Sequence, residues 1–201
     1  ASRFTSEVAK ELVGLAICVA EWSFFYGLEL LAGSEALRLL WSQFAYIGTY
    51  GAAVFLIRFS SRWLLPGRPG WWMVLLWIVP LVMVVGAFTN AWHFLVWTSV
   101  RPSALPYIWI YERGPLFWLG IGFYYIVAVV AFLMIVVAAA TRRGIYRYQA
   151  LLLLIGISVP IVANVLYVTR ALAAFPLDVT PVGLAVASAF FAAGIRRARL
   201  L

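Results

Sequence analysis

The feature that most constrains this chain is a series of six long apolar runs, separated by short breaks rich in glycine, proline or charge. The runs cover approximately residues 8–31, 36–59, 71–92, 116–140, 148–168 and 176–195. A helix needs about 20 apolar residues to cross the hydrocarbon core of a bilayer, so each run is long enough to span it. With 66% hydrophobic and 11% charged residues, the chain has too little polar surface for a water-soluble domain. The sequence predicts an all-α membrane protein, a six-helix transmembrane bundle that forms one domain over residues 1–201.

The basic residues predict how this bundle is oriented. When successive breaks are assigned to alternate sides of the membrane, all of the 15 Lys and Arg residues except Arg38, Arg101, Arg113 and Arg170 fall on one side. Basic residues in short loops are retained in the cytoplasm, so both chain ends are predicted to face the cytoplasm from a multi-pass inner membrane protein. The net charge of +8 does not indicate nucleic acid as a partner, because the arginines lie between apolar runs rather than along a groove.

The break between the third and fourth runs has the composition of a β-hairpin. Phe94–Val100 and Tyr107–Tyr111 are rich in aromatic and β-branched residues, and Pro102–Pro106 separates them. We expect a small extracytoplasmic hairpin over about residues 94–112. Its aromatic side chains either rest in the membrane interface or cap a cavity between the helices, and both alternatives stay open.

Two acidic residues lie inside the first apolar run. Glu21 and Glu29 are eight residues apart, which places them within about 80° on one helical face, so that face should point into the bundle. Glu29 lies near the outer end, where Arg38 or Arg170 are candidate partners. Glu21 lies deeper and should be protonated or hydrogen-bonded, either as a proton or ligand sensor or as a helix-to-helix contact.

Other polar residues recur at helical spacing in later runs. Gln43, Tyr46 and Tyr50 share a stripe that can bond to neighbouring helices. Asn90, His93 and Trp97 would form a similar stripe if the third helix continued through His93. One histidine without a second axial ligand or a cofactor motif is weak evidence for haem, so no cofactor and no metal site is expected.

In the fifth run, Pro160 removes a helical hydrogen bond one turn before Asn164, which can serve the freed carbonyl group. Pro160 is either a structural kink or a hinge that transmits a signal. The polar residues together predict a hydrogen-bond network or ligand site toward the outer half of the membrane, lined by Glu29, Gln43, Tyr46, Asn90 and Asn164. Glu21 and Pro160 are predicted as a possible buried acid and a possible switch.

An ordered set of short motifs covers nearly the whole chain. They are Glu29-Leu30, Trp41 with Tyr46-Ile47-Gly48, Thr89-Asn90-Ala91-Trp92-His93, Gly114-Pro115-Leu116-Phe117-Trp118 with Tyr124, Tyr146-Arg147-Tyr148-Gln149, Pro160 with Asn164, and Pro176-Leu177-Asp178-Val179-Thr180-Pro181. In this order the chain resembles the N-terminal seven-transmembrane sensor region of prokaryotic histidine kinases. The resemblance implies that the six runs are helices two to seven of a seven-helix sensor, that a cytoplasmic output domain follows Leu201, and that the protein acts as a homodimer.

The predicted function is therefore a non-catalytic membrane sensor that detects an external or lipid-soluble signal and relays it through the last helix. The alternative is a structural or accessory subunit of a larger membrane complex. A transporter is disfavoured because paired broken helices and internal repeats are not evident. An intramembrane enzyme is disfavoured because Glu21, Glu29 and one histidine do not supply facing catalytic groups, and no kinase motif is present. Membrane lipids are the remaining expected partner.

Overall fold

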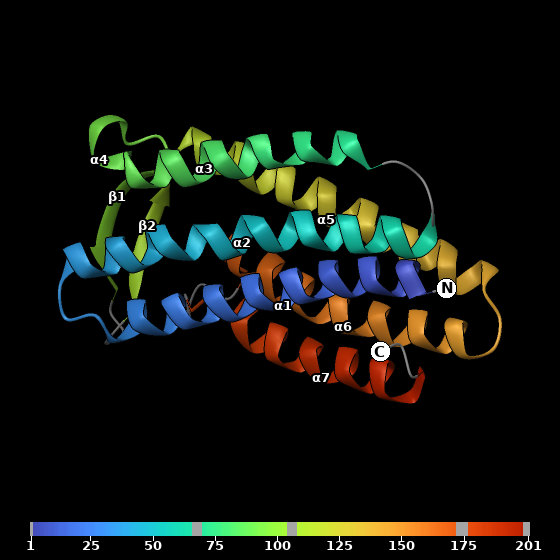
Figure 1. Ribbon diagram of the computed structural model, residues 1–201. Coiled ribbons are helices and arrows are strands. Elements are labelled where there is room, and N and C mark those ends of the chain that lie inside the picture. The colour runs from blue at the N-terminus through green and yellow to red at the C-terminus, as the bar shows by residue number, and fades with distance from the viewer. Residues whose placement is uncertain (1, 66–69, 104–107, 172–176, 199–201) are drawn as a thin grey trace. The chain divides into compact units, whose positions relative to one another are not determined.

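The computed structural model describes residues 2–65, 70–103, 108–171 and 177–198, and it is predominantly helical (Figure 1). Its elements are α1 (Ser2–Leu31), α2 (Glu35–Leu64), the 3-10 helix η1 (Trp71–Trp77), α3 (Ile78–Phe88), α4 (Asn90–His93), β1 (Trp97–Pro102), β2 (Trp109–Arg113), α5 (Pro115–Thr141), α6 (Ile145–Val168) and α7 (Thr180–Ala198). The predicted fold class, an all-α membrane protein with a small hairpin, is confirmed. Both chain ends, Pro176 and the tip of the predicted hairpin at 104–107 lie outside the described residues.

The surface of α3 shows that the solvent around this chain is lipid. Ile78, Leu81 and Val85 are 56%, 65% and 53% exposed, whereas Met83 and Ala87 of the same helix are fully buried. An apolar face this open would be an aggregation site in water, but it is the normal lipid-facing surface of a membrane helix.

The lengths of the helices also indicate a membrane protein. Within the described residues, three helices, α2, α5 and α6, are long and apolar enough to cross a membrane, and Met73–Phe88 and Thr180–Phe190 are shorter apolar segments. The chain is an integral membrane protein, and six crossings stay a prediction.

The third predicted run is not one continuous α-helix. It begins as the 3-10 helix η1 and becomes α-helical at Ile78. Pro80, which has no backbone N–H to donate, lies in the first turn of α3, where the missing donor costs least. Thr89 then separates α3 from α4, and its hydroxyl donates back to the Val85 carbonyl at 2.7 Å.

The described chain divides into two compact units. One, here called the hairpin unit, contains residues 14–55 and 69–127; the other, the α6–α7 unit, contains residues 1–13, 56–68 and 128–201. Three helices, α1, α2 and α5, therefore have their two ends in different units.

In the hairpin unit, β1 and β2 pair antiparallel beside the end of α1 and the start of α2 (Figure 1). Val100 pairs with Tyr111 and Trp97 with Arg113, with a bulge between Trp97 and Ser99. The chain enters the hairpin from α4 through Phe94, whose φ of 55° is left-handed. Val96 and Trp97 are buried at this junction and pack with Ala87 of α3.

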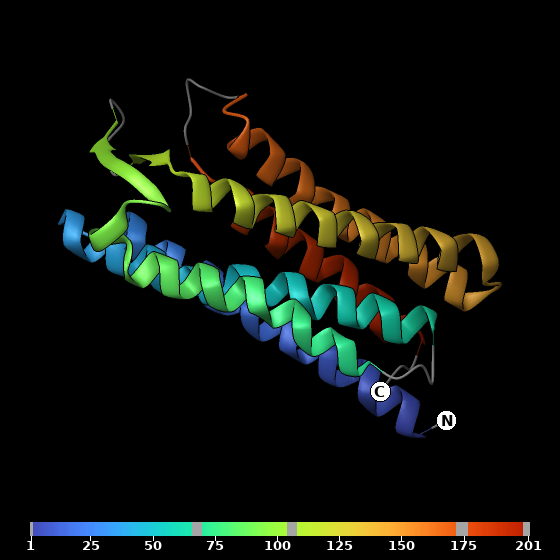
Figure 2. The same ribbon diagram turned by 90° about the horizontal axis from the view of Figure 1, so that it is seen from above.

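In the α6–α7 unit, α6 and α7 run antiparallel and side by side, as Figures 1 and 2 both show. They lie close together at Pro160 and Gly183, where a Cβ on the glycine would lie 3.0 Å from the proline Cα. A side chain larger than hydrogen at position 183 would therefore press against the α6 backbone at this crossing. Ile135 of α5 and Ile157 of α6 are buried in the core of this unit with Phe59 of α2.

Candidate functional site

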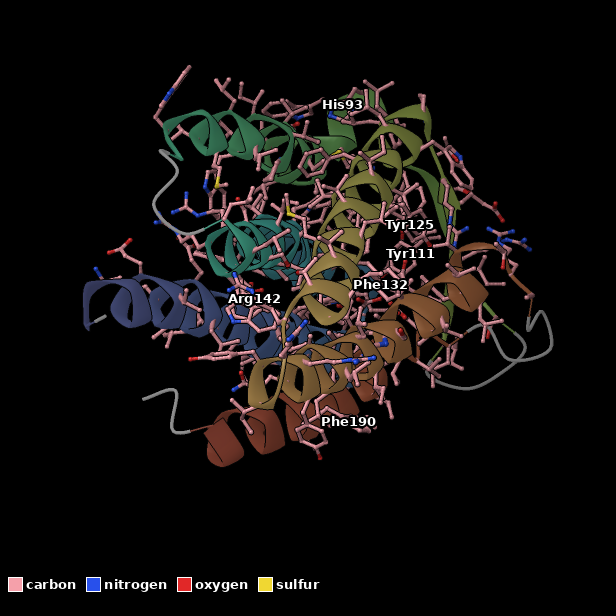
Figure 3. The ribbon with its side chains drawn as sticks, turned by 90° about the vertical axis from the view of Figure 1, so that its right-hand side faces the viewer. His93, Tyr111, Tyr125, Phe132, Arg142 and Phe190 are labelled. Carbon is pink, nitrogen blue, oxygen red and sulfur yellow. The ribbon has the colours of Figure 1, made fainter. Side chains whose placement is uncertain are left out.

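The side chain of Tyr111 on β2 joins the hairpin to two helices of its unit (labelled in Figure 3). Its hydroxyl donates to Glu29 Oε1 of α1 at 2.7 Å. The Ser42 hydroxyl of α2 lies 3.0 Å from the same oxygen and donates to it, because the single Tyr111 proton is already committed to Glu29. A hydrogen bond to a charged or buried carboxyl is among the stronger polar contacts, so this triad fixes the hairpin against the α1–α2 pair.

Aromatic rings surround this triad. Trp97 of β1 is only 4% exposed, and its ring centroid lies 5.2 Å from Tyr46 of α2 and 5.5 Å from Tyr111. Tyr46 in turn contacts Tyr50 at 5.5 Å. These distances fall in the favourable range for aromatic pairs. The polar triad of Glu29, Ser42 and Tyr111 therefore lies beside a cluster of packed aromatic rings.

Asn90, at the start of α4, holds the entry to β1. Its side-chain oxygen accepts from the backbone N–H of Val96 at 2.9 Å and of Trp97 at 3.2 Å, and its amide donates to the Trp97 carbonyl at 2.9 Å. Asn90 is 8% exposed, so all three bonds are shielded from water. These three bonds orient Trp97, and the predicted role of Asn90 as a lining residue stays a prediction.

His93 uses both of its ring nitrogens within the hairpin unit. Nδ1 accepts from the Leu95 backbone N–H at 2.9 Å, and Nε2 lies 3.0 Å from the Thr89 hydroxyl. Because the Thr89 proton already goes to Val85, Nε2 is the donor and the ring is in the Nε2–H form. This imidazole shapes the α4 turn. Among the described residues there is no group of three or more His, Cys, Asp or Glu side chains that could hold a metal.

Arg38 closes the turn between α1 and α2. It is 4% exposed, its Nη2 donates to the Ala32 carbonyl at 2.9 Å, and its guanidinium lies 5.4 Å from the centroid of the Trp109 ring on β2. The hairpin is thus attached to the helices through Trp109 as well as through Tyr111. Cation–π contacts gain strength when they are desolvated, as this one is.

Three of the five predicted lining residues, Glu29, Tyr46 and Asn90, lie along the contact between the hairpin and the helices. Gln43 of α2 is half-buried and, within the part of the chain that the structure describes, has no hydrogen-bond partner. Its role as a lining residue stays a prediction.

The fifth, Asn164 of α6, belongs to the α6–α7 unit. Its amide donates to the Thr180 hydroxyl at 3.3 Å, and Thr180 passes its own proton to Asp178. Asp178 also accepts from the Thr180 backbone N–H at 2.9 Å, which caps the start of α7. Asn164 therefore ties α6 to the first turn of α7, one turn beyond the Pro160 and Gly183 crossing.

Glu21 lies at a close contact between α1 and α2. A Cβ placed on Gly48 would overlap the Glu21 carboxyl group and the Cys18 carbonyl, and one on Gly51 would lie 2.8 Å from the Cys18 sulfur. Both Glu21 oxygens are shielded from solvent and, among the described residues, neither has a hydrogen-bond partner. An unpartnered carboxylate in this position would be very costly, so the neutral acid is the form that fits.

A second polar cluster, in the α6–α7 unit, was not predicted from the sequence. Glu11 of α1 is 3% exposed and accepts from Arg58 Nε and Nη2, both at 2.8 Å, and from Arg62 Nε at 2.7 Å. Arg62 also lies 3.2 Å from Glu7. The sequence does contain a pattern that could have predicted this cluster. Glu7 with Glu11 and Arg58 with Arg62 each have the i, i+4 spacing that places them on one helical face.

The geometry defines a class of protein: an integral membrane module in which a small β-hairpin is bound to the helices by a partly buried polar triad. Over residues 1–201 the chain matches the family described as the N-terminal 7TM region of histidine kinase. It belongs to that family and is a membrane sensor module, as the sequence motifs predicted. Searches of curated proteins and of solved structures found no match.

Proposed function

We propose that the hairpin unit detects an extracytoplasmic or lipid-soluble signal and that the helices relay it to a cytoplasmic output domain. The observation that carries the proposal is the bond from Tyr111 to Glu29, supported by Ser42. Through this bond one side chain of a surface hairpin depends on the position of both α1 and α2. A signal that displaces Tyr111 would leave Glu29 without its donor and change how the two helices are held.

The surroundings of the triad indicate the kind of ligand. Glu29 and Ser42 offer one hydrogen-bonding position at Tyr111, whose ring lies beside Trp97 and, through it, Tyr46. Sites of this kind suit a largely apolar molecule that carries one hydrogen-bond donor, which is the chemistry of a lipid-soluble signal. The ligand would compete with Tyr111 for the Glu29 carboxyl group.

The proposed relay follows the helices whose ends lie in both units. α1 runs from Glu11 to Glu29, and α2 runs from Ser42 to Arg58 and Arg62, so each of the two helices carries a member of the triad and a member of the Glu11 cluster. A shift between them at one end must be absorbed or transmitted at the other, because a helix is stiff along its axis and a buried ion pair resists separation. From there the last helix, α7, would carry the change to the output domain, with both chain ends in the cytoplasm.

The experiment joins this chain to the cytoplasmic region of a histidine kinase and measures autophosphorylation in membranes. Tyr111→Phe removes only the hydroxyl that bonds Glu29, so the level of output should change at unaltered expression. Thr98→Val is the matched control, because it removes a hydroxyl from the same hairpin that bonds only the Glu112 carbonyl, at 3.3 Å. Equal output from the parent chain, Tyr111→Phe and Thr98→Val would contradict the proposal and favour the accessory-subunit alternative.

A further inference from the structure

The turn between α5 and α6 presents three arginines within six residues. Arg142 and Arg143 follow the last residue of α5, and Arg147 lies in the first turn of α6; all three are exposed. Gly144, with a φ of +61°, makes the sharp reversal possible, since this backbone conformation strains residues that have a Cβ. We call residues Arg142–Arg147 the basic turn. Figure 3 views the end of the α6–α7 unit where it lies, with Arg142 labelled.

The arginines of the basic turn differ from Lys10, Arg58 and Arg62 of the same unit in having no acidic partner among the residues that the structure describes. Arg58 and Arg62 are neutralised by Glu11 and Glu7, and Lys10 pairs with Glu7 at 2.9 Å. Among the described residues, no carboxylate pairs with Arg142, Arg143 or Arg147. The positive charge of the basic turn is therefore available to a partner outside the chain.

The depth of the basic turn in the membrane indicates what kind of partner binds it. α5 and α6 are both long and apolar enough to span, so the residues that join them must lie at the level of the lipid headgroups. Ile145, Tyr146 and Tyr148 flank the arginines and are 44%, 52% and 39% exposed. Exposed aromatic and aliphatic side chains beside arginines suit the headgroup region, where rings and stems contact acyl chains and guanidinium groups meet phosphate.

From these observations we infer that the basic turn is a binding site for the headgroups of anionic phospholipids. Guanidinium groups bind phosphate through paired hydrogen bonds, and each basic residue near an anionic membrane surface adds to the attraction. The occupancy of this site would anchor the α5–α6 turn at the membrane surface. The inference is independent of the proposed signal at Tyr111, which lies in the hairpin unit.

The test is lipid retention by the purified whole chain in a neutral detergent, measured by native mass spectrometry with phosphatidylglycerol and with phosphatidylcholine. The parent chain should retain phosphatidylglycerol preferentially. Its preference should fall by about fivefold for each arginine replaced, and high salt should weaken it. The combined variant Arg142→Gln, Arg143→Gln, Arg147→Gln should lose the preference, whereas the three corresponding lysine substitutions should keep most of it.

Arg101→Gln is the matched control, because Arg101 is also an exposed arginine, 62% accessible, but is paired with Glu112 at 3.1 Å. It should retain the parent preference. Equal retention of the two lipids by the parent chain would overturn the inference, as would an undiminished preference in the glutamine variant. Displacement of phosphatidylglycerol by equimolar inorganic phosphate would also overturn it, since the site would then bind free phosphate rather than a lipid headgroup. If the triple glutamine variant does not fold, the single variant Arg147→Gln is measured instead. An undiminished preference for phosphatidylglycerol in that variant would overturn the inference.

Discussion

Tyr111 donates a 2.7 Å hydrogen bond to Glu29, a residue 82 positions earlier in the chain. The bond joins the second strand of the hairpin to the last turns of α1, and Ser42 of α2 donates to the same tyrosine. Removing the hydroxyl with Tyr111→Phe leaves a half-buried carboxyl group and a buried hydroxyl short of a partner. We expect a loss of about 1–3 kcal/mol in the free energy of unfolding, measured by denaturant titration in detergent. Thr98→Val should lose less than half as much, and equal losses would mean that the triad adds no more stability than the exposed bond of Thr98.

Asn90→Ala should destabilise the hairpin unit more than Tyr111→Phe does. The substitution removes the acceptor of two backbone N–H groups and the donor to one carbonyl, all on buried Val96 and Trp97. Each buried backbone group that loses its partner costs about 1–3 kcal/mol. The fluorescence of the tryptophans during unfolding provides the measurement. A loss smaller than that of Tyr111→Phe would show that water replaces the lost bonds and that Trp97 is not held by Asn90.

The Glu11 cluster allows a matched pair of charge removals. Glu11→Gln removes the buried negative charge that faces Arg58 and Arg62 and leaves one acceptor oxygen where there were two, and the expected cost is about 3–5 kcal/mol. Glu7→Gln affects a carboxylate whose side chain is 38% exposed, so its cost should be at most about 1 kcal/mol. Thermal unfolding in detergent distinguishes the two. Similar shifts in melting temperature for both variants would contradict the burial of Glu11.

Glu21→Gln should be tolerated, because the carboxyl group it replaces has no hydrogen-bond partner among the described residues and fits best as a neutral acid. Gly48→Ala should not be tolerated, since its Cβ would overlap Glu21 and the Cys18 backbone, and overpacking of this kind costs about 1–3 kcal/mol. The two variants are compared by thermal unfolding. Strong destabilisation by Glu21→Gln would show that the charged carboxylate is the form that the fold needs.

The sequence was sufficient for the elements that depend on local pattern. Apolar runs of membrane length predicted the helices, and the aromatic and β-branched residues around Val100 and Tyr111 predicted the hairpin. The break at Thr89 was not predicted, because the apolar pattern continues across it and the side-chain bond to Val85 is invisible in composition.

Contacts between distant residues could not be predicted in the same way. Glu29 was singled out because it is acidic within an apolar run, but its partner Tyr111 is one of ten tyrosines, and the pairing depends on how the hairpin folds back. Arg58 and Arg62 lie on the side of the membrane predicted to hold most of the basic residues. Their role in orienting the chain was therefore a sufficient explanation for them. Their bonds to Glu11 become evident only when α1 and α2 are placed side by side.

The central claim is that Glu29 and Tyr111 act together as one element of the sensor. The most direct measurement is a double-mutant cycle with Glu29→Gln and Tyr111→Phe, reading autophosphorylation of a fused histidine kinase output region at equal expression. If the bond is the element that the signal acts on, the double variant should show no larger change in output than the stronger single variant. Changes that add independently, or output unaltered in all three variants, would contradict the account.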